Sequence, residues 1–113
     1  MSNRSPSHFI NDILSSIDRV VNYTSKISFE EFSANYMMQE ACLYNIQVIG
    51  EAVSRLPNEF KDKEPGIPWG LIKGMRNRLI HDYFGTDLEL VWNVINQELP
   101  SLKTKLKDLR LNP

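Results

Sequence analysis

Hydrophobic positions recur every three or four residues along most of this 113-residue chain, which is the spacing of one face of an α-helix. The first such pattern follows Ser5-Pro6, a favourable N-cap residue before a proline at the first helical position, and ends near Tyr23. Its apolar positions are Ile10, Ile13, Ile17, Val20 and Val21, and its polar positions are Asn11, Asp12, Ser15, Ser16, Asp18 and Arg19. This pattern predicts an amphipathic helix.

A second, longer helix is predicted from about Asn35 to Leu56. Before it, Ser28 and Glu31 have the spacing of a capping box and predict a short helical turn. The long helix has two neighbouring apolar stripes: Met38, Cys42, Ile46, Ile49, Val53 and Leu56 in one, and Met37, Ala41, Tyr44, Val48 and Ala52 in the other. A helix that is apolar around so much of its circumference lies at the centre of a core, or faces both a core and a partner.

The segment 57–68 has three prolines and a glycine and is predicted to be a loop. A third long helix starts at Pro68-Trp69, with Trp69, Ile72, Met75 and Leu79 as its buried side. Either Thr86 or Asp87 caps the last helix, in which leucine, valine and isoleucine recur at Leu88, Val91, Ile95, Leu99, Leu102, Leu106 and Leu109. Pro100 should kink or divide that helix. No strand-like alternation is evident, so residues 1–113 predict one all-α domain, a bundle of four or five helices.

Composition narrows the setting and the partners. The net charge of −1 excludes strong attraction of polyanions by the whole molecule, so any nucleic acid must contact a local basic patch. Lys73, Arg76 and Arg78 form one candidate patch; the C-terminal run Lys103, Lys105, Lys107 and Arg110 is more typical of a solvated helix face. The chain has neither an apolar run of membrane-spanning length nor a secretory signal, and its one cysteine favours a cytoplasmic setting.

Several kinds of catalytic site are disfavoured. The five glycines are scattered, so no phosphate-binding loop is present. One cysteine and two histidines are too few for a typical zinc or iron–sulfur site, and we expect no metal and no cofactor. Cys42 lies in an apolar stripe that disfavours its thiolate, and His8 lies near the N-terminus, where solvent exposure is expected. His81 is therefore the strongest titratable candidate.

His81 belongs to the stretch "MRNRLIHDYF", residues 75–84. On a continuous helix Asn77 and His81 share a face, and Lys73 precedes Asn77 by one turn. Arg76 and His81 are five positions apart and point about 140° away from each other. Two arrangements would bring them to one ligand: the helix ends near His81, or a second subunit supplies its own copy across a twofold axis.

These residue types suit the cleavage of RNA by its own 2′-hydroxyl. Histidine transfers protons near neutral pH, and arginine stabilises a phosphate that gains charge in the transition state. His81 would accept the 2′-OH proton or protonate the leaving 5′ oxygen, Arg76 would hold the phosphate oxygens, and Asn77 would orient the imidazole or a phosphate oxygen. A purely structural role is also open, because Arg and His near a helix C-terminus stabilise the helix dipole.

Three segments together resemble one family. "RNRLIHDY" matches the Arg-x4-His-x-Tyr motif of HEPN-domain proteins of the HepT type, the toxin partners of small MntA-type nucleotidyltransferase antitoxins. "IGEAVSRLP" (49–57) is similar to the family's second-helix signature, and residues 68–102 follow its pattern. The resemblance covers nearly the whole chain, without a departure inside the motif.

The resemblance implies an antiparallel helical bundle that forms a homodimer, with the motif in the cleft between subunits. It also implies a metal-independent ribonuclease with Arg76 and His81 as catalytic residues and Asn77 beside them. The positive charges of Lys73 and Arg78 on the same stretch would support substrate binding in such a cleft. Tyr83 matches the tyrosine that the antitoxin AMPylates in some members; packing or hydrogen-bonding support is its alternative role.

Two further points stay open. Glu51 either pairs with an arginine of the cleft or faces solvent. For the whole chain, the alternative to a ribonuclease is a non-catalytic helical accessory subunit that helps a nucleotidyltransferase to hold its substrate.

Overall fold

The computed structural model describes residues 5–84 and 87–109; for Arg76 and residues 78–84 it describes the backbone alone. All regular structure in these ranges is helical, which confirms the predicted fold class. The elements are α1 (Pro6–Thr24), α2 (Phe29–Ser33), α3 (Tyr36–Arg55), α4 (Asn58–Asp62), α5 (Trp69–Phe84), α6 (Leu88–Asn93), the π-helical segment η1 (Val94–Glu98) and α7 (Leu99–Asp108). Four long rods, α1, α3, α5 and the run α6–η1–α7, make up the bundle.

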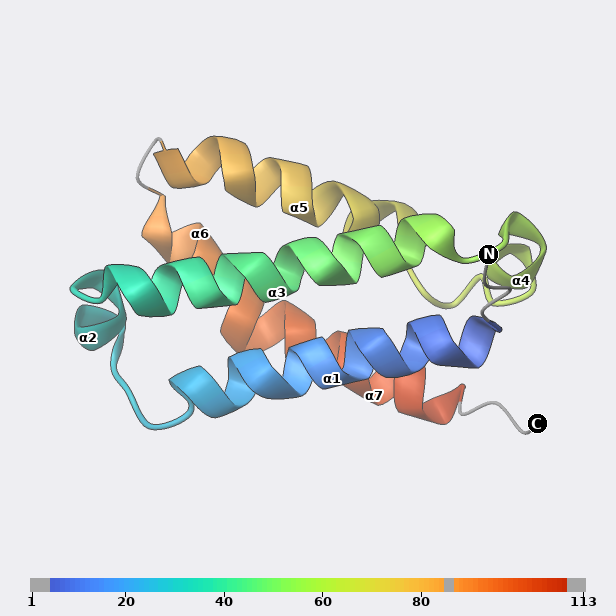
Figure 1. Cartoon of the computed structure of the whole chain (residues 1–113), viewed down its shortest axis with the longest axis horizontal. Helices are drawn as coiled ribbons and strands as arrows, with labels where there is room; N and C mark the ends of the chain where they lie inside the picture. Colours follow the sequence, from blue (N-terminus) through green and yellow to red (C-terminus); the bar gives the residue numbers. More distant parts are fainter. Residues whose placement is uncertain (1–4, 85–86, 110–113) are drawn as a thin grey trace.

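The rods pack side by side in an elongated bundle of 42 × 29 × 26 Å. Figure 1 shows α3 between α1 and α5, and it packs against both. These neighbours run in opposite directions, and α7 returns along α1 in the direction opposite to it. Among the helices in the described ranges, none is both long and apolar enough to cross a bilayer.

Short polar signals start the helices where the sequence predicts. Ser28 and Glu31 form the predicted capping box, with the Ser28 backbone N–H donating to Glu31 Oε1 at 2.8 Å and the Glu31 N–H to Ser28 Oγ at 3.1 Å. Asn35 Oδ1 accepts from the Met38 N–H at the start of α3, and Asp87 Oδ1 accepts from the Leu90 N–H at the start of α6. Asp87 is therefore the cap of the last helix; Thr86 lies outside the described residues. Each cap satisfies a backbone donor that has no partner inside its helix.

One core runs through the bundle and contains most of the predicted apolar positions. The buried residues include Ile13, Ile17, Cys42, Ile46, Ile49, Val91, Ile95, Leu99 and Leu106. The predicted polar face of α1 is wrong at Ser16, which is 0% exposed and whose hydroxyl has no hydrogen-bond partner among the described residues. A serine is small enough to fit such a position, but burial of an unpaired hydroxyl lowers stability.

The segment after α3 is not wholly a loop, because residues 58–62 form the short helix α4. Lys61 Nζ donates to the Val53 carbonyl at 3.1 Å, which holds α4 against the end of α3. Trp69 Nε1 donates to the carbonyls of Lys61 and Glu64 at 3.2 and 3.1 Å. These tertiary contacts fix the place where α5 begins.

Pro100 divides the last helix as predicted. It has no N–H to donate to the carbonyl four residues earlier, and the chain before it widens into η1, where the Leu99 N–H donates to the Val94 carbonyl. In Figure 1 the chain changes direction between α6 and α7. The wider turn also changes which residues face the core, so that Val94 is buried as well as Ile95. The three- and four-residue spacing of the apolar positions predicts only Ile95 there.

Candidate functional site

The whole motif lies on one helix, because α5 extends from Trp69 to Phe84. The helix therefore continues past His81 and ends at Phe84, less than one turn further on. On a continuous α-helix, Arg76 and His81 are separated by a rise of about 7.5 Å and a rotation of about 140°. The two arrangements that would bring these residues to one ligand, a helix end near His81 and a second subunit, both stay predictions, because the side chains of Arg76 and His81 lie outside the described residues.

The structure describes two of the predicted site side chains, Lys73 and Asn77. Both are exposed and lie one turn apart on α5, with Lys73 three residues before Arg76 and Asn77 directly after it. The side chains of Arg76, Arg78 and His81 lie outside the described residues, as does that of Tyr83, and so does that of the predicted core residue Leu79. Their roles stay predictions.

The inner side of α5 anchors the helix on the bundle. Ile72 and Met75 are buried as predicted, and the Trp69 ring lies against Phe60, with ring centroids 6.2 Å apart. The helix packs along α3 and runs antiparallel to it. As a result, the C-terminal half of α5, which carries the motif, lies at the same end of the bundle as the start of α3 (Figure 1).

The second apolar stripe of α3 leaves its two largest side chains open to solvent. Met37 is 82% and Tyr44 is 67% exposed, while Ala41 and Val48 on the same stripe are partly buried and Ala52 is buried. We call Met37, Ala41, Tyr44 and Val48 the outer face of α3. Large exposed apolar side chains that line one face of a helix are typical of an interaction surface.

Glu51 lies one turn after Val48 on the same side of α3 and is exposed. It borders a shallow cavity of about 160 Å³ between α1 and α3, together with Asp12 and Arg55. The predicted pair with an arginine of the motif depends on side chains outside the described residues.

The C-terminal basic run does not form one patch on the described chain. Lys103 Nζ lies 2.7 Å from Asp18 Oδ1 and pairs with α1, whereas Lys105 and Lys107 are exposed. Arg110 lies outside the described residues. Lys103 of this run therefore helps to hold α7 against α1. In the other candidate patch, Lys73 is the described lysine nearest in sequence to the motif.

Cys42 is buried in the core and is not a candidate nucleophile. It is 0% exposed, and burial raises the pKa of its thiol to about 12, so the reactive thiolate is absent near neutral pH. In the described ranges, no group of three or more His, Cys, Asp or Glu side chains gathers as a metal site would require.

The raised pKa of Cys42 predicts a loss of stability in alkali. Below about pH 9 the thiol is neutral in both the folded and unfolded states. Between pH 9 and the folded-state pKa of about 12 only the unfolded state ionises, so the free energy of unfolding should fall by about 1.4 kcal/mol per pH unit. Urea denaturation at pH 8, 9 and 10.5 measures this slope, and the Cys42→Ala variant should lack that contribution. If the free energy of unfolding falls with pH equally steeply in the wild type and in Cys42→Ala, the predicted contribution of Cys42 is contradicted.

Comparison with known proteins assigns the chain to a family. The model of the family described as "Ribonuclease HepT-like" matches residues 13–109. A Thermococcus cleftensis protein named "Probable ribonuclease HepT" is 38% identical over 95% of this chain and 97% of its own length. "Putative RNase MJ1380" of Methanocaldococcus jannaschii is 37% identical over 95% of this chain and 98% of its own length. No solved structure shows a significant match. The chain therefore belongs to the ribonuclease HepT-like family.

Proposed function

We propose that the protein is an endoribonuclease that cleaves RNA through the 2′-hydroxyl next to the scissile phosphate. His81 takes the proton of the 2′-OH, O2′ bonds to phosphorus, and the bond from phosphorus to O5′ breaks. The leaving O5′ takes up a proton, which gives a 2′,3′-cyclic phosphate and a 5′-hydroxyl end. Arg76 stabilises the charge on the phosphate oxygens, and Asn77, Lys73 and Arg78 hold the substrate.

The observation that carries this proposal is the full-length relationship to HepT-like ribonucleases together with an intact Arg76 and His81 on one helix. An accessory subunit would need neither a titratable group nor an arginine at this spacing. The exposed Lys73 supports the proposal, because it adds to the same helix a cation that can bind phosphate oxygens.

We propose further that the active form is a homodimer built on the outer face of α3. This face leaves Met37 and Tyr44 open to solvent on α3, the helix that packs against the motif helix α5. A twofold contact there would place the two α5 helices near one another, so that Arg76 of one subunit could serve with His81 of the other. The cleavage needs two proton transfers, and two copies of His81 would supply one each.

The regulation that we propose follows from the same family. A nucleotidyltransferase antitoxin would neutralise the enzyme, and AMPylation of Tyr83 would silence it. Tyr83 is two residues after His81, so an added phosphate would put negative charge and bulk beside the site of the substrate phosphate. The alternative function, a non-catalytic accessory subunit of such a nucleotidyltransferase, predicts binding of the partner without cleavage of RNA.

Cleavage of RNA by the purified protein in the presence of EDTA tests the proposal. We expect products with 2′,3′-cyclic phosphate and 5′-hydroxyl ends, and no cleavage where the scissile nucleotide is 2′-deoxy, since the nucleophile is then absent. Products with 5′-phosphate ends would contradict the mechanism. A protein that binds a nucleotidyltransferase but leaves varied RNAs intact would support the accessory subunit instead.

A further inference from the structure

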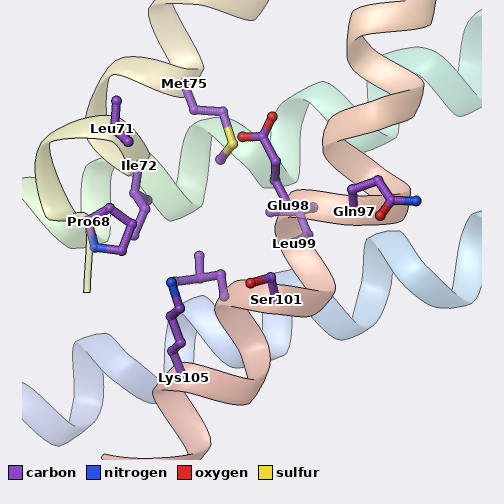
Figure 2. Close-up of a pocket in the computed structure, with 10 residues that line it drawn as sticks. Pro68, Leu71, Ile72, Met75, Gln97, Glu98, Leu99, Ser101 and Lys105 are labelled. Atoms are coloured by element: carbon purple, nitrogen blue, oxygen red, sulfur yellow. The ribbon is translucent and has the colours of Figure 1, made fainter. Parts of the chain in front are cut away.

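A groove separates the first half of α5 from η1 and α7, on a side of the bundle that the proposed function does not use. It encloses a cavity of about 350 Å³. Its apolar lining comes from both walls: Pro68, Leu71, Ile72 and Met75 from the α5 side, and Leu99 and Leu102 from α7. We call it the α5–α7 groove; Figure 2 shows it in close-up. Its size is at the lower end of the range of ligand pockets.

A lysine ammonium marks one end of this groove. Figure 2 shows the Lys105 side chain extending from α7 toward Pro68 and Ile72 on the opposite wall. No carboxylate in the described part of the chain lies within ion-pairing distance of Lys105, whereas its neighbour Lys103 pairs with Asp18. Glu98 and Met75 also line the cavity. The charge at the Lys105 end of the groove is therefore positive.

The rim of the groove indicates the size of its occupant. Leu71 is 73% exposed, and Pro68 beside it is also exposed. A small molecule inside the groove would leave the outer side of Leu71 in water, whereas a polypeptide lying across the groove would cover it. An exposed apolar rim around a concave apolar floor is typical of a surface that receives an anchor side chain of a partner protein.

We propose that the α5–α7 groove docks an amphipathic, acidic helical segment of a partner protein. One large apolar side chain of that segment fills the cavity over Ile72 and Leu102, and a carboxylate one turn away binds Lys105. The one-turn separation follows from the groove itself, since Leu102 and Lys105 are one turn apart on α7. The docking surface does not depend on ribonuclease activity.

The test is a titration of the isotope-labelled full chain with synthetic helical peptides, followed by amide chemical shifts in NMR spectra. The probe is an alanine-based peptide with two leucines one turn apart and two glutamates one turn further on. One matched peptide has lysines in place of the glutamates, and another has alanines in place of the leucines. We expect shift changes centred on residues 68–75 and 97–105 with the first peptide, and binding about fivefold to tenfold weaker with each of the others.

Two protein variants make the charge assignment specific. Lys105→Glu should reverse the preference, so that the lysine peptide binds better than the glutamate peptide. Lys107→Glu changes the net charge equally at an exposed position of α7 outside the groove and should leave the preference unchanged. Shift changes outside the groove, equal binding of the acidic and basic peptides, or equal effects of the two variants would overturn the proposal. So would decanoate binding to the groove more tightly than the glutamate peptide, which would assign the groove to a small amphiphile.

Discussion

Replacing His81 with alanine is expected to lower the rate of RNA cleavage by about 10²–10⁴-fold, because the reaction loses the group that transfers protons at O2′ and O5′. Arg76→Ala should lower it by about 10²–10³-fold, since the developing charge on the phosphate loses its cation. Single-turnover cleavage of a short RNA in EDTA, followed by analysis of the product ends, measures both effects. The thermal midpoint and the oligomeric state of each variant must match those of the wild type.

The chain offers a matched control for each substitution. His8→Ala removes the other histidine, and Arg19→Ala removes an exposed arginine; both positions are on α1, away from α5. Neither should change the rate by more than about twofold, because surface substitutions far from a site have small effects. Folded His81→Ala and Arg76→Ala variants that cleave at the wild-type rate would exclude the proposed catalytic roles.

Placing a charge on the outer face of α3 is the second change with a large expected effect. In Met37→Glu and Tyr44→Glu, a carboxylate would enter the centre of the proposed dimer contact on both subunits, where it is desolvated and meets its own copy. We expect both variants to remain folded, because these side chains are exposed in the monomer, and to sediment as monomers. If the site needs residues of both subunits, cleavage should fall by at least about 10²-fold in the same variants.

Leu71→Glu is the control for this experiment. It also places a carboxylate at an exposed apolar position, but that position lines the α5–α7 groove and not the outer face of α3. This variant should remain dimeric and active. Dimers of Met37→Glu and Tyr44→Glu would show that the contact lies elsewhere. A wild-type protein that is monomeric at the concentration at which it cleaves RNA would remove the need for a second subunit.

Local signals in the sequence were enough to predict most of the helices. The capping box at Ser28, the caps at Asn35 and Asp87 and the break at Pro100 act through residues within five positions of each other, so they can be recognised without a tertiary structure. The motif was predicted in the same way, because its residue types and spacing are local properties. The match of residues 13–109 to the ribonuclease HepT-like family confirmed the family that the motif indicated.

Features that depend on distant contacts were missed or left open. The helix α4 lies in a segment rich in proline, and Lys61 and Trp69 hold it through bonds to carbonyls eight residues away. Ser16 is polar, yet the packing of its neighbours buries it. The α5–α7 groove joins residues about thirty positions apart, and no pattern within either segment indicates it.

By itself, the sequence determined the all-α class, most helix boundaries and the residues of the motif, because helix periodicity, capping and proline chemistry operate within one or two turns. Only the tertiary structure decided which apolar stripe of α3 is buried. Both stripes have the same spacing and similar side chains, and the difference arises from the positions of α1 and α5 on either side of the helix. The tertiary structure also decided where α5 ends, which is at Phe84, three residues past His81.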